Sequence, residues 1–341
     1  MAINKRLLKG AAAAPIVSTD HFNTLTYTGD GSSSNSITGL NFQPDFVWIK
    51  SRTGTRSHAL YDSTRGPNKR LVSNGTQAEI SNSAFGSFDS GGFTVTGTDT
   101  SSNNNGEDYV SWCWRFNGGT TSSNTDGNVT TTVQANTTAG FSLVTWVGTG
   151  IVDTFGHGLN SAPELVIIKN KTDVVNWSVG ATPVGWTKYL KLNLPDAAAT
   201  SSVWWSNTAP TSSVVTVGPN NSANALNDDI VMYCFHSVSG FSKIGSYTGN
   251  GSTTGPTVTT GFQPRFLMVK NYSTASTNWR VVDSVRGTSS TQGAALFPNL
   301  NNIEQNTSAH AIDFQSNGFQ IRTSSSNWNG NGDEHLYLAI A

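Results

Sequence analysis

Charged side chains are scarce in this sequence. They make up only 12% of the 341 residues, about half of the roughly 25% usual in soluble proteins. The 20 Lys and Arg nearly balance the 21 Asp and Glu, which leaves a formal net charge of -1. Because long-range attraction to a phosphate backbone or an anionic membrane requires an excess of positive charge, we expect no nucleic-acid partner.

Cysteine and long apolar runs are also nearly missing. The two cysteines, Cys113 and Cys234, fall at matching places in two internal repeats, which favours buried apolar residues over a disulfide. No stretch approaches the roughly 18 consecutive apolar residues of a membrane-spanning helix. The start of the chain is basic like a signal peptide, but Lys9 interrupts the apolar run after Leu7 and Leu8. We therefore expect neither export nor membrane insertion.

Motifs for catalysis or metal binding are absent as well. The 6 histidines are scattered, neither cysteine has a neighbouring ligand, and no G-x-S-x-G elbow occurs. Asp62 and Asp283 suggest the carboxylate pair of a glycosidase. Each is followed by an arginine, Arg65 or Arg286, which favours instead a turn in which Asp caps backbone amides and pairs with Arg. The sequence thus predicts no enzyme, no metal and no cofactor, with a surface-polysaccharide depolymerase as the remaining alternative.

Small polar residues and aromatics are abundant instead. The 34 glycines and the many Ser, Thr and Asn residues suit short strands joined by turns. The 10 Trp, 8 Tyr and 16 Phe residues can bury far more apolar surface than a disordered chain needs. The chain is long enough for two or three cores, since typical domains hold about 100 to 150 residues.

Three blocks of sequence recur in the same order and define three repeats. The first is an aromatic strand that ends at a glycine turn, the second is a proline before an apolar run that closes on lysine, and the third is an acidic residue before an apolar strand. The first block occurs at Phe22–Gly31, Phe141–Gly150 and Phe241–Gly251. The second occurs at Gln43–Lys50, Ala162–Lys169 and Gln263–Lys270, and the third at Asp108–Trp114, Asp229–Phe235 and Glu334–Ile340. We expect each block to be a strand, and the closing Lys50, Lys169 and Lys270 to return their strands to water.

These repeats predict an all-β protein made of three tandem antiparallel β-sandwich domains, jelly-roll-like in connectivity. The expected parts are an N-terminal docking arm at residues 1–20, repeat 1 at 21–119, a polar linker at 120–138, repeat 2 at 139–238 and repeat 3 at 239–341. Repeats 1 and 3 share a D-S-x-R-G motif and an F-x-S-x-G-F hairpin, whereas repeat 2 lacks both and is divergent. Polar β-rich repeats of this kind favour an extended scaffold without catalytic function.

Four strings of repeat 1 carry a family resemblance: FQPDFVWIK, YDSTRGPNKRL, FDSGGF and YVSWCW. They resemble a repeated domain of virion structural and tail-fibre-like proteins of tailed phages, notably marine and cyanobacterial ones. Repeat 3 matches more loosely and repeat 2 poorly. The resemblance implies a virion component assembled in the bacterial cytoplasm, most simply a tail-fibre or head-fibre-like appendage that contacts the host surface, with a capsid decoration or cement protein as the alternative.

Two groups of residues are candidates for contact with partners. Trp204, Trp205 and Trp328 lie in Ser- and Asn-rich surroundings, where an exposed indole can stack on a host glycan, although core packing or an oligomer contact is at least as well supported. The arm is expected to dock on other virion proteins of the capsid or tail, or on neighbouring copies in a homo-oligomer such as a trimer. Its candidate docking residues are Lys5, Arg6, Leu7, Leu8 and Lys9.

Overall fold

The computed structural model describes residues 16–97, 99–287 and 293–341. Regular structure in these residues is almost entirely β-strand, and the helices are single turns. The all-β prediction is therefore confirmed. No helix in the described part of the chain is long and apolar enough to cross a membrane.

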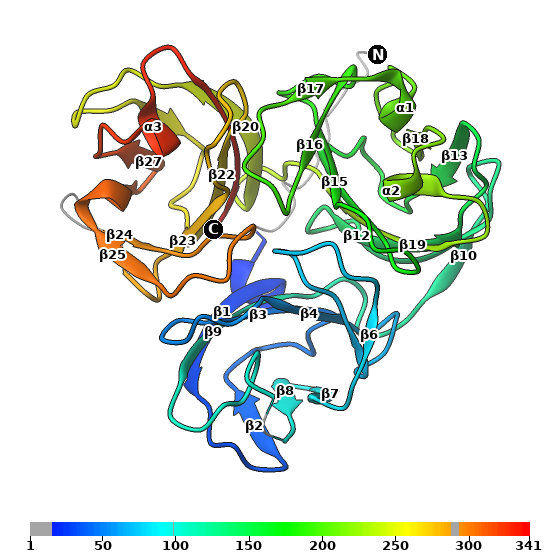
Figure 1. Ribbon diagram of the computed structural model, residues 1–341, viewed down its shortest axis with the longest axis horizontal. Helices are drawn as coiled ribbons and strands as arrows, with labels where there is room; N and C mark the ends of the chain where they lie inside the picture. Colours follow the sequence, from blue (N-terminus) through cyan, green and yellow to red (C-terminus); the bar gives the residue numbers. More distant parts are fainter. Residues whose placement is uncertain (1–15, 98, 288–292) are drawn as a thin grey trace, which may run out of the picture.

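The elements follow the order of the three repeats (Figure 1). Repeat 1 contains η1 (Ser18–Asp20), β1 (Phe22–Thr28), β2 (Asn35–Thr38), β3 (Phe46–Ser51), β4 (Ala59–Asp62), β5 (Lys69–Arg70), β6 (Ile80–Ser81), β7 (Phe85–Asp89), β8 (Gly92–Val95) and β9 (Asp108–Trp114). Then come β10 (Ser122–Asn124) and β11 (Thr131–Asn136). Repeat 2 contains β12 (Phe141–Val147), β13 (Asp153–Gly156), β14 (Leu165–Asn170), β15 (Ser178–Ala181), β16 (Lys188–Lys191), β17 (Ala199–Thr200), α1 (Ser202–Trp205), β18 (Val214–Val217), α2 (Asn221–Asn224) and β19 (Asp229–Phe235). Repeat 3 contains β20 (Ser242–Thr248), β21 (Thr257–Thr259), β22 (Phe266–Asn271), β23 (Arg280–Asp283), β24 (Gly293–Ala295), β25 (Gln305–Thr307), η2 (Ser308–His310), β26 (Ile312–Gln315), β27 (Gly318–Ile321), α3 (Ser326–Asn329) and β28 (Glu334–Ile340).

One antiparallel strand order recurs in every repeat. The inner sheet has the order β1-β9-β3-β4 in repeat 1, β12-β19-β14-β15 within the larger sheet of repeat 2, and β20-β28-β22-β23 in repeat 3. A smaller outer sheet faces each of them: β2-β8-β7, β13-β18 and β21-β27-β26 respectively. The strands β9, β19 and β28 coincide with the acidic third blocks read from the sequence.

Each inner sheet is buried on both faces, which explains the continuous apolar runs in its strands. Along β3, Val47 and Ile49 face the outer sheet and pack with Phe93 in the core of the sandwich. The alternate residues, Phe46 and Trp48, face the opposite way and belong to a second core. A strand with only one buried face would alternate apolar and polar residues instead.

The second core is shared by all three repeats and lies where their inner sheets meet. It unites Trp112 of repeat 1, Tyr233 of repeat 2 and Leu338 of repeat 3 with many neighbours. Figure 1 shows the three lobes arranged around this centre rather than in a row. The extended array expected from the sequence is therefore not observed, because the second apolar face of each inner sheet is buried only when the repeats close on one another.

The segment 120–138, predicted to be a polar linker, contains β10 and β11. These strands extend the inner sheet of repeat 2 beyond β12. Val133 is buried in the core of repeat 2, and the Gln134 amide donates to the hydroxyl groups of Ser63 and Thr64 in repeat 1. The segment is rich in β-branched Thr and Val, which suit a pleated strand. It therefore fastens two repeats together.

The structure describes only residues 16–20 of the N-terminal arm. Ile16 packs against the shared core, and η1 leads directly into β1. The candidate docking residues Lys5, Arg6, Leu7, Leu8 and Lys9 lie outside the described residues.

Candidate functional site

Polar groups cross every junction between repeats, and each junction repeats the same backbone hydrogen bond. A backbone amide in a loop of one repeat donates to a backbone carbonyl of the next repeat. That carbonyl belongs to the residue two positions after the lysine that closes the second sequence block. The three pairs are Glu79 with Lys171 (2.7 Å), Ala198 with Tyr272 (2.8 Å) and Glu304 with Arg52 (2.8 Å). The third pair joins repeat 3 back to repeat 1, so the three junctions close a ring.

A nitrogen of an aromatic side chain supplies a second hydrogen bond at each junction. The Trp177 Nε1 group of repeat 2 donates to the Val72 carbonyl of repeat 1 at 2.9 Å, and Trp279 of repeat 3 donates in the same way to Lys191. At the closing junction His58 replaces tryptophan, with its Nε2 atom 2.8 Å from the Phe297 carbonyl.

The two ring nitrogens of His58 have different roles. Its Nδ1 atom accepts from Trp48 Nε1 at 2.8 Å, which assigns the proton to Nε2. Burial lowers the pKa of His58 to about 3. The neutral imidazole is therefore the form that holds the ring closed.

The three repeat lysines are buried at these junctions, contrary to the expectation that they return their strands to water. The Lys169 ammonium donates to the carbonyls of Asn170, Asp173 and Val175 at 2.6, 3.2 and 3.0 Å. Lys270 likewise donates to Thr277 at 2.6 Å and to Pro195 of repeat 2 at 3.3 Å. The loops that follow each strand curl around the Nζ atom and so replace water.

Burial lowers the pKa of Lys50 to about 7, of Lys169 to about 8 and of Lys270 to about 7. Three close carbonyl acceptors around Lys169 nevertheless require three N–H donors, which only the ammonium form supplies. The contact geometry therefore favours the charged form at neutral pH. The side chain acts as an internal cross-link for its loop.

The D-S-x-R-G aspartates form the turn predicted from the sequence. Asp62 accepts from the Arg65 backbone amide at 2.9 Å and pairs with its guanidinium at 2.5 Å, and both side chains are almost completely buried. Asp283 and Arg286 do the same, with an ion pair of 2.7 Å. The predicted turn, in which Asp caps a backbone amide and pairs with Arg, is therefore present in both repeats.

Each of these aspartates also accepts a hydrogen bond from the next repeat around the ring. The Tyr233 hydroxyl donates to Asp62 at 2.9 Å, and Trp112 Nε1 donates to Asp283 at 2.9 Å. In repeat 2, Ala181 stands at the aspartate position, as its pairing with Leu165 shows. The residue that would be its donor is Leu338 of repeat 3, which is apolar. Donor and acceptor are thus absent together at the junction between repeats 2 and 3.

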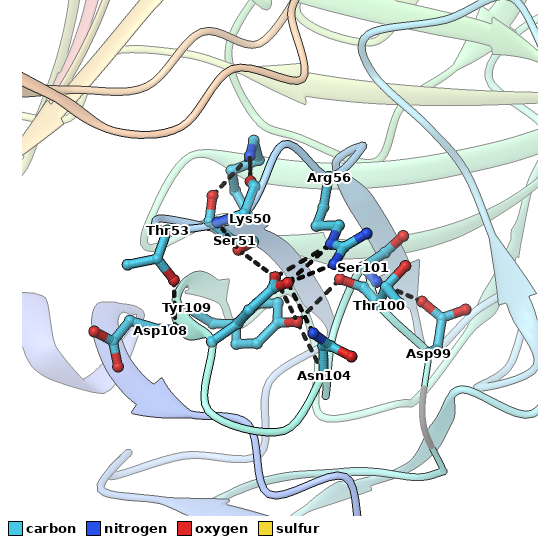
Figure 2. Close-up of polar contacts among 12 residues, drawn as sticks. Lys50, Ser51, Thr53, Arg56, Asp99, Thr100, Ser101, Asn104, Asp108 and Tyr109 are labelled. Atoms are coloured by element: carbon cyan, nitrogen blue, oxygen red, sulfur yellow. Dashed lines mark hydrogen bonds and ion pairs between the residues drawn. The ribbon is translucent and has the colours of Figure 1, made fainter.

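A cluster around Glu107 contains the densest side-chain hydrogen bonding of repeat 1 (Figure 2). Glu107 accepts from Arg56 Nη2 at 2.6 Å, from Asn104 at 2.8 Å and from the Ser51 hydroxyl at 2.9 Å. Figure 2 shows the polar ends of Arg56, Asn104 and Ser51 and the Tyr109 hydroxyl converging on one group. The hydrogen bond from Arg56 is the main cause that lowers the pKa of Glu107. The carboxylate is ionised and its oxygens are occupied, so it is poorly suited to acid catalysis.

The same position is acidic in all three repeats, which indicates a structural task. Asp228 accepts from Asn170 at 2.7 Å, and Asp333 accepts from Asn271 at 2.8 Å. Each acid ties the end of the lysine strand to the loop before the last inner strand. A catalytic group would seldom be repeated within one chain.

The match to known families covers the whole ring. A domain of unknown function, DUF7483, matches residues 17–341. The chain belongs to this family. No curated protein matches the chain. The DUF7483 match includes all three repeats and the segment between the first two, so it covers the whole ring of this chain rather than a single repeat.

The tryptophans proposed for glycan stacking have separate environments in this DUF7483 chain. Trp205 and Trp328 are both 0% exposed and pack inside the sandwich cores of repeats 2 and 3. Trp204 is half-buried, stacks on Tyr189 with ring centroids 3.5 Å apart, and donates to Ser178 at 3.0 Å. Ser- and Asn-rich flanks therefore did not indicate exposure. Trp204 alone keeps some accessible surface.

In the part of the DUF7483 chain that the structure describes, the ring contains neither a metal site nor a large central cavity. The described residues contain no group of three or more His, Cys, Asp or Glu side chains able to hold an ion. Cys113 and Cys234 are buried and unpaired, as predicted. The space at the centre measures about 20 Å³ and is lined by apolar side chains such as Trp48, Ile167 and Met268. That volume holds about one water molecule and no organic cofactor.

Proposed function

We propose that this chain is a non-enzymatic structural component of a tailed-phage particle, most simply an appendage protein that contacts the host surface. The proposal combines two supports. The first is the resemblance of the repeat 1 strings to phage virion domains. The second is that buried polar groups at the junctions, around Asp62, Asp283 and Lys270, join each repeat to its neighbour.

The observation that carries the structural part is the closure of the ring. All three junctions repeat one backbone hydrogen bond, so each repeat has both of its neighbours and no open end remains for further stacking. A closed body of this kind suits a rigid head or knob more than an elongated shaft. Its three related lobes present similar surfaces around one centre, which favours weak, repeated binding strengthened by avidity.

A capsid decoration protein is the second candidate, and the same ring supports it. Three related lobes about one axis within a single chain provide the arrangement that a homotrimer otherwise supplies (Figure 1). Such a body matches a threefold position on an icosahedral shell. In either case the arm at residues 1–20 is proposed to dock on other virion proteins or on neighbouring copies of this chain.

Immunogold labelling of intact particles with an antibody against repeat 3 separates these candidates. Label on the tail or its fibres supports the appendage function, and label spread over the shell supports decoration. Label on neither, with the protein found only in infected cells, overturns both. Incubation with host polysaccharide followed by an assay for reducing ends tests the depolymerase alternative, and new reducing ends would replace the non-enzymatic proposal.

A further inference from the structure

The tip of repeat 2 carries a cluster of exposed apolar side chains. Val147 is the last residue of β12, Ile151 and Val152 lie in the turn that follows it, and Leu226 lies in the facing loop after α2. Their exposed fractions are 56%, 61%, 49% and 65%. Gly150 holds the two loops together through a hydrogen bond to Asn224 at 2.9 Å. We call these four residues the apolar tip.

The other two repeats have the same turn but polar residues at all four positions. In every repeat a glycine amide donates at 2.8 Å to the backbone carbonyl of the acidic residue in the facing loop, so the three turns have the same backbone hydrogen bond. The donors are Gly29, Gly148 and Gly249. The residues at the four positions are Thr28, Ser32, Ser33 and Asn105 in repeat 1, and Thr248, Ser252, Thr253 and Asn331 in repeat 3. Because the turn forms with polar residues, folding does not require the apolar ones. Four simultaneous exposed apolar residues indicate a contact surface.

Acidic side chains surround the apolar tip. Asp229 is the direct cross-strand partner of Val147, and Asp153 follows Val152 in the chain. Asp228 adds a third carboxylate in the same loop. Lys171 supplies one positive charge, and its backbone amide donates to the Asp229 carbonyl at 2.8 Å. The tip therefore suits an apolar partner with basic flanks.

Two copies of the tip are poor partners for each other. Packing one tip on another would bring the carboxylates of Asp153, Asp228 and Asp229 against their counterparts, and like charges brought together at an interface cost several kcal/mol. The remaining exposed large apolar residues, Val17, Val174, Val203, Val285 and Ile303, come from five separate segments of the chain. The partner must be sought elsewhere in the sequence.

We propose that the apolar tip binds residues 3–9 of a second copy of this chain. This segment reads Ile-Asn-Lys-Arg-Leu-Leu-Lys, with Leu7 and Leu8 between three basic residues and no acidic one. Its composition complements the tip in both apolarity and charge. The resulting contact joins two different surfaces, so it links rings head to tail. The inference concerns self-association and does not depend on the particle to which the protein belongs.

The chain's own segment is badly placed to cover its own tip. Ile16 packs against the shared core, to which β12 contributes its first residue, Phe141, whereas the tip lies at and beyond the far end of that 7-residue strand. An extended chain spans about 3.3 Å per residue, so the 8 residue-to-residue steps from Leu8 to Ile16 reach about 26 Å. The strand itself takes up most of that distance in a straight line. A path around the lobe is longer, which favours a second molecule.

Sedimentation velocity of the full chain over a range of concentrations tests the proposal. The tip variant is V147T/I151S/V152T/L226N, which installs the residues of repeat 3, and the arm variant is L7S/L8S. The matched control is V203T/V285T, which makes exposed apolar residues elsewhere polar. We expect the unmodified chain and the control to associate, and both other variants to do so roughly tenfold or more weakly. Association of the unmodified chain should weaken as salt rises.

Mixing the tip and arm variants is the decisive step. The tip variant keeps an intact arm and the arm variant keeps an intact tip, so together they should form one-to-one dimers that do not grow further. An unmodified chain that stays monomeric at every concentration overturns the proposal. It is overturned equally if the arm variant associates as well as the unmodified chain, or if the mixture stays monomeric. Circular dichroism melts of each variant show that the ring itself is intact.

Discussion

At the scale of single residues, the buried ions of this protein act at junctions between repeats. Asp62 is completely buried, pairs with Arg65 and also receives the Tyr233 hydroxyl from the next repeat. Repeat 2 replaces the pair with Ala181 and Val184, and apolar groups fill the space. One chain therefore shows both an ionic and an apolar solution to the same junction, in line with the modest net stabilisation of buried ion pairs.

This comparison predicts opposite outcomes for partial and complete replacement. Asp62→Ala leaves Arg65 and Tyr233 without their main partner, and we expect it to lower the free energy of unfolding by about 3 to 5 kcal/mol. The triple variant D62A/R65V/Y233L copies the residues of the apolar junction and should recover most of that loss. Urea unfolding monitored by fluorescence measures both. If the triple variant is as unstable as the single one, the two junctions are not interchangeable.

Buried histidines predict a loss of stability in acid. Burial lowers the pKa of His58 to about 3 and that of both His157 and His310 to about 4, below their ordinary value of 6.5. The unfolded chain therefore binds more protons between about pH 6.5 and pH 4, so the folded state is fully stabilised above pH 6.5 and loses stability as pH falls. The expected slope is about 1.4 kcal/mol per pH unit for each histidine.

Denaturant midpoints measured between pH 7 and pH 4.5 test this acid dependence. His58→Trp serves as the matched variant, because Trp177 and Trp279 hold the same position in the other repeats and each donates to the corresponding carbonyl of the preceding repeat. It should reduce the slope by one proton. An unchanged slope would assign the acid sensitivity to other groups.

At the scale of elements, the inner sheet is the repeated unit, and what attaches to its edges differs between repeats. Repeat 2 gains β10 and β11 from the segment 120–138. Their residues are mostly polar, which explains why the sequence indicated a linker. Pairing with β12 and the burial of Val133 become apparent only in the folded chain.

Replacement of residues 120–138 by a Gly/Ser sequence of equal length distinguishes a linker from a structural segment. A passive linker would tolerate the change. The structure predicts a fall in the thermal midpoint of several degrees, because the buried Val133 and the Gln134 bonds to repeat 1 are lost. A Gly/Ser replacement of the exposed residues 252–254 is the control and should leave the midpoint nearly unchanged.

At the scale of the whole molecule, the shared core makes the three repeats interdependent. Phe46, Phe266 and Phe235 come from different repeats and lie in one cluster. Separating any repeat would expose the apolar face that it contributes. The protein is thus closer to a homotrimer contained in one chain than to a string of independent domains.

This arrangement predicts a single cooperative unfolding transition for the full chain. Far-UV circular dichroism and tryptophan fluorescence should give coincident curves in urea, because no repeat keeps its core after another has unfolded. Independent domains would give separate steps, with the divergent repeat 2 differing most. Two resolved transitions would show that the shared core contributes little to cohesion.

The sequence alone predicted the three block strands of each repeat and their order along the chain. Local signals suffice for this, since Gly turns and short apolar runs bound β9, β19 and β28 at the predicted residues. The turn formed by Asp62 and Arg65 was equally local, because its partners are three residues apart. The family resemblance supplied the proposed setting but no site.

The contacts between repeats became apparent in the folded chain and could not be predicted from the sequence pattern. Trp177 finds its acceptor at Val72, 105 residues earlier in the chain, and nothing in the local pattern names that partner. The same is true of Lys169 and of Trp205, which composition placed near water and the fold buried. Burial depends on which surfaces cover a residue, and at a junction those surfaces come from another repeat. The ring is therefore a property of the long-range contacts.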